Sequence, residues 1–277
     1  MRQNLSTNLR VSLLTTATLL PGAWPARAQL VGGSVTPGMT TTGMTTTGLT
    51  TPAEVTAPAR QPSLVRPFLD VFSDVKRLPT RDNLKWLTVG LVAAAAAYPA
   101  DRRVTDNLSR ASKPVQESFE PGPVLGGTPL ELGAAFATYA IGRATRSPRA
   151  VSLGGDLIRA QLLAELMTTG VKQTVRRSRP EGSGFSFSSG HAAVTFASAT
   201  VLQRHLGWKA GIPAYAVAGY VAASRVQMKR HYLSDVVFGA AIGLTAGRTV
   251  TVGRSFVVEP LIVNGGAGAV FTWNPKR

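Results

Sequence analysis

Three clusters of charged and polar residues between positions 172 and 235 constrain the fold of this chain more than any other feature. They are Lys172-(six residues)-Arg179-Pro180, then Ser188-Ser189-Gly190-His191, then Ser224-Arg225-(five residues)-His231-(three residues)-Asp235. Together they hold three cations, two imidazoles, one carboxylate and a Ser-Gly turn. If they act together, segments far apart in the sequence must fold so that the two histidines face each other across a hole surrounded by the cations.

The first cluster suits the binding of an oxyanion. Lys172 and Arg179 are seven residues apart, which returns them to nearly the same face of a helix. Pro180 places Arg179 at or beyond the helix end, where its side chain can reach into a cleft. A guanidinium offers two donors to phosphate oxygens, and an ammonium adds a point charge for a third. The alternative is a solvated basic face, since Arg176 and Arg177 lie between the two.

The second cluster combines an anion-binding turn with a histidine. Ser189 and Gly190 allow consecutive backbone N–H groups to converge on an anion, and a helix that begins near His191 adds its positive end. The Ser189 hydroxyl can be a further donor. His191 would then stand at the edge of the anion, where it can give a proton to a leaving oxygen. The alternative is a serine N-cap on an ordinary helix.

The third cluster contains a histidine–carboxylate pair. His231 and Asp235 are four residues apart and lie side by side on a helix. A carboxylate on one ring nitrogen fixes the tautomer and leaves the other nitrogen as a nucleophile. Arg225 supplies a third cation, which matters most as charge shifts in a transition state. A purely structural His–Asp hydrogen bond is the alternative. His205, the third histidine of the chain, has no such neighbours and is predicted to be a surface residue.

The sequence offers no motif for a metal or another cofactor. No acidic cluster has metal-ligand spacing, and neither an HExxH motif nor a Gly-rich P-loop is present, so we expect neither metal nor cofactor. The chain has no cysteine, which excludes disulfides, thiolate zinc sites and a cysteine nucleophile.

The three clusters resemble the signature of the type 2 phosphatidic acid phosphatase (PAP2) superfamily, which also includes vanadium haloperoxidases. That signature is K-x6-RP, then PSGH, then SR-x5-H-x3-D, and every spacing is intact here. One position differs, because Ser188 stands where the family has proline, which would stiffen the turn. The resemblance implies an α-helical bundle that hydrolyses phosphomonoesters or pyrophosphates, small or lipid-linked, without a metal.

The resemblance also implies a role for each matching residue. His231 would be the nucleophile that forms a phosphohistidine, Asp235 would orient it, and His191 would protonate the leaving group. The phosphoryl oxygens would be held by Lys172, Arg179, Ser189, Gly190 and Arg225. Two alternatives remain: a vanadium-dependent haloperoxidase, in which His231 would be a vanadium ligand, and a non-catalytic anion- or lipid-binding protein.

The N-terminus has the three parts of a secretory signal peptide. Arg2 and Arg10 come before a short apolar run, Val11 to Leu20, and Ala26-Arg27-Ala28 forms a small-x-small end. The run is shorter than the roughly 20 apolar residues that a membrane span needs. A buried helix of the mature fold is the alternative. We expect residues 1–28 to be removed and the protein to be exported to the periplasm, where it is soluble or associated with the membrane surface.

Charge limits the partners of the exported chain. Removing residues 1–28 takes away three arginines and no acid, so the formal charge falls from +16 to +13. Nucleic acid is not expected outside the cell, which leaves an anionic membrane surface or a phosphorylated small-molecule or lipid substrate.

Residues 29–62 contain the sequence Met-Thr-Thr-Thr-Gly twice in succession. They are predicted to be a disordered spacer, with a fibrous or adhesive repeat as the alternative.

The rest of the chain predicts an all-α domain over residues 63–250, a bundle of about six to eight helices. Apolar spacing and breaker residues place helices near 64–76, 83–98, 129–146, 150–175, 191–206, 212–223 and 232–248. Residues 101–128 are predicted to be a polar loop with one short helical piece. The uncharged segment 86–100 favours a buried helix over a membrane span. The tail, 251–277, is predicted to contain a β-hairpin that turns at Asn264-Gly265-Gly266.

Overall fold

The structure, a computed structural model, describes residues 63–252, 256–263 and 266–273. The predicted signal peptide, 1–28, and the predicted spacer, 29–62, lie outside these residues. The helical part of the chain and the C-terminal hairpin belong to two separate units.

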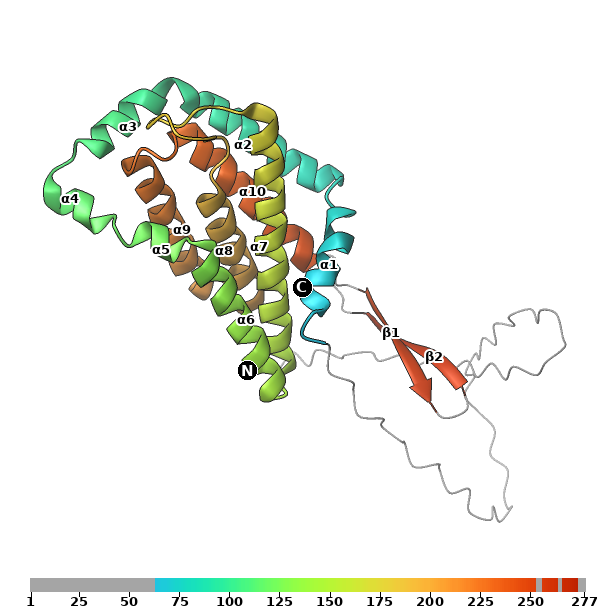
Figure 1. The fold of residues 1–277 in the computed structure, drawn as a ribbon. Coiled ribbons are helices and arrows are strands. Elements are labelled where there is room, and N and C mark those ends of the chain that lie inside the picture. Colours follow the sequence, from blue (N-terminus) through green and yellow to red (C-terminus); the bar gives the residue numbers. More distant parts are fainter. Residues whose placement is uncertain (1–62, 253–255, 264–265, 274–277) are drawn as a thin grey trace, which may run out of the picture. The chain divides into compact units, whose positions relative to one another are not determined.

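The all-α fold predicted from the sequence is confirmed, and seven helices of the described chain match predicted segments. They are α1 (Arg66–Val75), α2 (Arg81–Ala97), α6 (Thr128–Ala144), α7 (Pro148–Val175), α8 (Gly190–Leu206), α9 (Trp208–Gln227) and α10 (Leu233–Val252). Figure 1 shows α6 to α10 packed together, with α3 across one end of the bundle.

The segment predicted to be a polar loop with one short helical piece, residues 101–128, forms three short helices, and a 3₁₀ turn precedes them. These are η1 (Tyr98–Ala100), α3 (Asp101–Ser109), α4 (Lys113–Ser118) and α5 (Gly122–Leu125). Proline in the interior of a helix would break it. Pro99, Pro114 and Pro123 instead stand in the first turn of η1, α4 and α5. Proline is well tolerated there, because the first N–H groups of a helix have no partner within it.

The central helix of the bundle is α8, which packs against α7, α9 and α10. Small side chains allow this: most of its buried residues are Ala, Ser, Thr or Val. On α10, three glycines four residues apart face α8. A Cβ at Gly239 would lie 2.6 Å from the Ser189 carbonyl oxygen, one at Gly243 2.3 Å from the Ala193 carbonyl oxygen, and one at Gly247 2.6 Å from Thr200 Cβ. The two helix backbones are therefore in direct contact.

A buried group of charges attaches α1 to α7 and to the C-terminal end of α8. Arg159 donates to both carboxylate oxygens of Asp74 and, at 3.1 Å, to Asp156. His205 Nε2 lies 2.9 Å from the other oxygen of Asp156. His205, predicted to be a surface residue, is partly exposed, at 21% of its side chain, and has a carboxylate partner. The sequence could not indicate this contact, because Asp156 is 49 positions away.

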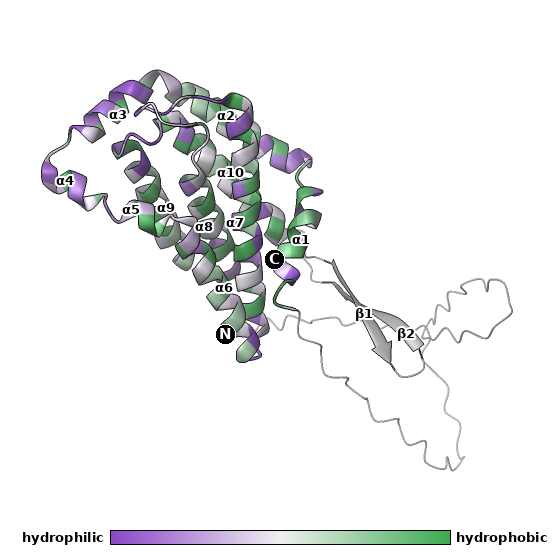
Figure 2. Cartoon of the chain, viewed as in Figure 1, coloured by the Kyte–Doolittle hydropathy of each residue, from purple (hydrophilic) through white to green (hydrophobic). Residues whose placement is uncertain are grey.

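Several helices expose large apolar side chains. On α1 these include Leu69 and Phe72, at 62% and 72% exposure. The expectation that α2 is buried is also wrong, since it buries only Asn83, Gly90 and Ala94 and exposes most other positions. Figure 2 shows these hydrophobic stretches on α1 and α2. Within the described ranges, we find no helix with both the length and the hydropathy required to cross a bilayer.

The C-terminal hairpin pairs two antiparallel strands. Strand β1 (Phe256–Val263) runs against β2 (Gly266–Trp273), with Phe256 opposite Trp273 and Val263 opposite Gly266. Two of the three predicted turn residues, 264 and 265, lie outside the described residues. The register leaves a two-residue connection, as expected for a tight hairpin turn.

Candidate active site

The three sequence clusters meet at one end of the helical bundle. The chain runs along α7, turns through residues 176–189, and returns along α8; α9 and α10 form a second such pair. Both turns therefore lie at the same end of the bundle, beside α3 (Figure 1). The Ser189 N–H donates to the Asp235 carbonyl oxygen at 3.1 Å, which joins the second cluster to the third.

Electrostatic contacts bring the first cluster to the same place. Lys172 lies in the last turn of α7, where its charge interacts with Arg179, Arg225 and Asp235. Its Nζ is 3.6 Å from the position that a Cβ at Gly190 would take. Burial lowers the pKa of Lys172, and the two arginines lower it further. The structure therefore gathers the predicted cations around the start of α8.

His231 is almost completely buried, at 2% exposure. Its Nδ1 lies 2.7 Å from the carbonyl oxygen of Ser186 and 3.7 Å from Asp235 Oδ2. A carbonyl oxygen can only accept, so Nδ1 carries the proton and Nε2 holds a lone pair. Burial lowers the pKa of His231, and the nearby carboxylate of Asp235 raises it by less. The ring is thus held as a neutral tautomer suited to nucleophilic attack.

Asp235 lies beside His231, and its carboxylate oxygens also accept hydrogen bonds from other groups. Asp235 Oδ2 accepts the Tyr232 N–H at 2.8 Å, and Oδ1 accepts from Arg177 at 3.0 Å. The first bond is a capping interaction, in which a first-turn acid of α10 reaches back to the residue before the helix. The backbone carbonyl of Ser186, a residue that sequence reasoning missed, also accepts from Nδ1 and helps to orient the ring. A backbone carbonyl leaves no signal in a sequence.

His191 lies in the first turn of α8, close to several positive charges. Burial lowers its pKa to about 4, and Arg225, His231 and Lys172 act in the same direction. A hydrogen bond to the Pro123 backbone opposes this shift. The ring is therefore neutral near pH 7 until a negative charge enters the site.

The other predicted anion-binding groups differ in their partners within the protein. Ser189 is the N-cap of α8, and its hydroxyl accepts the Ala192 N–H at 3.5 Å. Gly190 is the first residue of that helix. Arg179 interacts with Glu181, 3.7 Å away, and donates to the Phe185 carbonyl oxygen.

Arg225 has unused donor capacity at this point. Burial lowers its pKa to about 10, with Arg230 and Arg179 contributing. Within the described part of the chain, its buried Nε has no hydrogen-bond partner, and neither have Ser188 Oγ, next to Ser189, and Thr168 Oγ1. Among the described residues, no carboxylate lies within ion-pair distance of Lys172 or Arg225. Unpaired buried donors of this kind are costly unless a ligand uses them, and an oxyanion would do so.

Two further charged residues near the site were not predicted. The Glu165 carboxylate lies 3.2 Å from the position of a Cβ at Gly190, and its charge raises the pKa of Lys172. Its seven-residue spacing from Lys172 on α7 is the signal that could have identified it. Arg177, interpreted from the sequence as a candidate solvated residue, instead pairs with Asp101 and Asp235.

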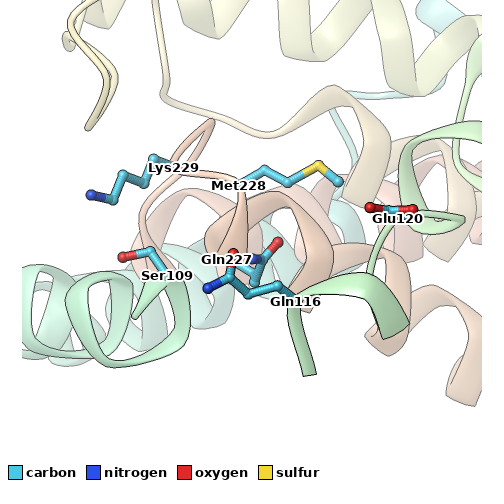
Figure 3. A pocket seen from close by; sticks show the side chains of 6 residues that line it. All are labelled: Ser109, Gln116, Glu120, Gln227, Met228 and Lys229. Carbon is cyan, nitrogen blue, oxygen red and sulfur yellow. The ribbon is translucent and has the colours of Figure 1, made fainter. Parts of the chain in front are cut away.

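A separate surface cavity of about 410 Å³ lies on the segment that follows Arg225. It is lined by Ser109, Gln116, Glu120, Gln227, Met228 and Lys229, as Figure 3 shows. None of the predicted site residues lines it. The described residues contain no group of three or more His, Asp or Glu side chains that could hold a metal ion.

Comparison with known proteins finds a family match for the part of the chain that carries the site. Residues 171–257 match the model of the PAP2 superfamily. A lipid A 1-phosphatase of Porphyromonas gingivalis is 39% identical over 101 residues, which cover 34% of this chain. The match spans only 22% of that relative.

Two solved structures are similar in shape. One is a transmembrane PAP2-type phosphatidylglycerolphosphate phosphatase from Bacillus subtilis, at 20% identity and a TM-score of 0.49, covering 68% of this chain and 93% of that one. The other is LpxE from Aquifex aeolicus, at 21% identity and a TM-score of 0.46, covering 54% and 93%. Neither TM-score reaches 0.5. The segment that matches the PAP2 model contains all three clusters in their family spacing.

Proposed function

We propose that this chain is a metal-independent phosphatase that hydrolyses phosphomonoesters or pyrophosphates through a phosphohistidine on His231. The observation that supports this most is the setting of His231, whose Nδ1–H donates to Ser186 and whose other nitrogen holds a lone pair. The charges of Lys172 and Arg225 act on this ring, and the charge of Arg179 acts on those two cations. They supply the positive charge that a phosphoryl group needs as it is transferred.

The reaction has two steps. In the first, the Nε2 lone pair of His231 attacks phosphorus, the bond to the leaving oxygen breaks, and protonated His191 gives that oxygen a proton. In the second, the oxygen of a water molecule attacks phosphorus while neutral His191 takes a proton from that water. The bond between His231 and phosphorus then breaks, which releases phosphate. Lys172, Arg179, Arg225 and the Ser189–Gly190 turn hold the phosphoryl oxygens throughout.

His191 gains its acidic proton from the charge of the substrate. Its pKa of about 4 leaves it neutral in the empty site. A bound phosphoryl group places negative charge beside the ring and opposes the effect of Arg225 and Lys172, so the pKa rises. The same residue can then serve as acid in the first step and as base in the second.

A lipid-linked phosphate at a membrane surface is the first substrate class to test. The lipid A 1-phosphatase among the relatives and the apolar side chains exposed on α1 and α2 both favour it.

We also propose the following organisation: a signal peptide over 1–28, a spacer over 29–62, the phosphatase domain over 63–250 and a hairpin tail over 251–277. The enzyme would act in the periplasm, associated with the membrane surface.

Trapping the intermediate tests the mechanism. The full chain is mixed with ³²P-labelled lipid-linked and small phosphomonoesters, and turnover is stopped by denaturation at alkaline pH. We expect label on His231 in the wild-type protein and none on His231→Gln. His205→Gln is the control and should keep the label, because His205 lies at the other end of α8. Label on a serine, or label that persists in His231→Gln, would exclude this nucleophile.

A further inference from the structure

Arg177 occupies the centre of a buried hydrogen-bond network beside the proposed nucleophile. Its side chain is 20% exposed. One terminal nitrogen donates to Asp101 at 2.7 Å, and the other donates to Asp235 at 3.0 Å and to the Ser234 hydroxyl at 2.8 Å. A planar guanidinium can hold two carboxylates at fixed positions in this way, whereas an ammonium cannot.

Aromatic rings restrict the same guanidinium on its faces. Its central carbon lies 4.0 Å from the ring centre of Tyr232 and 5.0 Å from that of Tyr98. Both distances are within the range of cation–π contact. Both terminal nitrogens of Arg177 therefore already have partners within the protein, and two aromatic rings contact its guanidinium, which leaves it poorly suited to hold a substrate.

The network also determines where α10 begins. Asp101 accepts the Ser234 N–H at 2.8 Å and the Ser234 hydroxyl at 2.6 Å. Asp101 and Asp235 are buried, at 3% and 0% exposure, and Arg177 lies between them. Without that cation, two buried carboxylates would face each other unpaired, an arrangement that destabilises a protein strongly.

The position of the His231 ring depends on Asp235 and on the start of α10. It precedes α10 by two residues, and its Nδ1 is 3.7 Å from Asp235. A shift of Asp235 or of the first turn of α10 would change the position of the ring relative to Ser186. Displacement of a reacting group by about 1 Å can lower a rate by about 100-fold.

We propose that Arg177 is a positioning residue of this site, which holds Asp235 and the start of α10 so that the unprotonated nitrogen of His231 faces the phosphoryl group. The inference rests on the proposed function. It assigns Arg177 a role different from that of Lys172 and Arg179, between which it lies in the sequence: those two contact the phosphoryl group, and Arg177 does not.

Steady-state kinetics of Arg177→Gln separate these roles. We expect kcat to fall by about 100-fold, while KM and the Kd for sulfate, a tetrahedral anion, stay within about threefold of the wild-type values. Arg176→Gln is the matched control, because Arg176 is the adjacent arginine and is exposed, and it should behave as wild type. Adding Asp101→Asn to Arg177→Gln removes one of the two unpaired carboxylates and should recover part of the lost kcat.

A second measurement does not depend on activity. The chain has three histidines, so each imidazole can be assigned in long-range ¹H–¹⁵N spectra by single substitution. We expect one tautomer for His231 in the wild type, protonated on Nδ1, and a mixture in Arg177→Gln. An unchanged tautomer, an unchanged kcat, or a loss confined to KM or sulfate affinity would each overturn the proposal. If Arg177→Gln does not fold, Arg177→Lys decides by the same criteria, with smaller changes expected.

The spectra also distinguish a failure of the proposed phosphatase function from a failure of the proposed role of Arg177. A wild-type protein that hydrolyses no phosphate ester would contradict the proposed function. The tautomer comparison would still show whether Arg177 controls the orientation of His231.

Discussion

The neutral state of His191 leads to a prediction about proton uptake. Its pKa of about 4 lies below the ordinary value of 6.5, so at pH 6 the empty site holds it unprotonated. A bound dianion favours the imidazolium and raises that pKa, so binding should take up to one proton from solution. Sulfate is a suitable probe, because its own charge does not change in this range. Titration calorimetry in two buffers of different ionisation enthalpy measures the uptake.

The control for this experiment is His191→Gln, which should bind sulfate without uptake of a proton. Uptake in the wild type should also decline as the pH approaches 4, where the ring is already protonated before sulfate binds. A binding heat that is the same in both buffers at pH 6 would contradict the prediction.

Candidate site residues could be named from the sequence because the chemistry restricts which residue types are suitable. Only certain side chains hold a phosphoryl group, and the spacing of Lys172, Arg179, His191, Arg225 and His231 was sufficient to select them. Their partners were less accessible to prediction. The Ser186 carbonyl that holds His231 is available in any residue type, and the carboxylate of Asp101 is 76 positions from Arg177.

At the scale of elements, the contact of α10 with α8 depends on glycine. A methyl group at Gly243 would lie 2.3 Å from the Ala193 carbonyl oxygen and 2.8 Å from the Ala197 nitrogen, both backbone atoms. Gly243→Ala should therefore separate the two helices and lower the free energy of unfolding by about 1–3 kcal/mol. It should also lower activity, because α8 carries His191 and α10 carries Asp235. Urea unfolding measures the first effect.

Gly219→Ala is the matched control for this substitution. Gly219 lies on α9, and a Cβ there would meet no atom within 4 Å. The same change should raise helix stability by about 0.5–1 kcal/mol, since alanine is the better helix former. Equal effects at both positions would show that the close approach of α10 to α8 has no energetic importance.

At the scale of the whole molecule, exposed apolar side chains and a high positive charge predict association with anionic membranes. Phe72, 72% exposed on α1, is a suitable position for a test. Phe72→Glu should weaken flotation of the full chain with anionic vesicles by about tenfold or more, because an aromatic side chain can no longer enter the interface. High salt should weaken the wild-type interaction as well.

Ser73→Glu provides the comparison, because it adds the same charge at the neighbouring exposed position without removing apolar surface. It should reduce binding less than Phe72→Glu does. Equal losses would mean that charge alone accounts for the association and that the apolar side of α1 has no part in it.

The sequence alone determined the all-α fold, the approximate bounds of seven helices and the residue types at the candidate site. These properties follow from local periodicity and from the few side chains that can perform phosphoryl chemistry. Only the tertiary structure decided that η1, α4 and α5 have proline in their first turn, that His205 pairs with Asp156, and that Arg177 connects Asp101 to Asp235. The reason is physical: each of these contacts depends on how distant backbone segments pack against one another, and helical spacing contains no information about such distances.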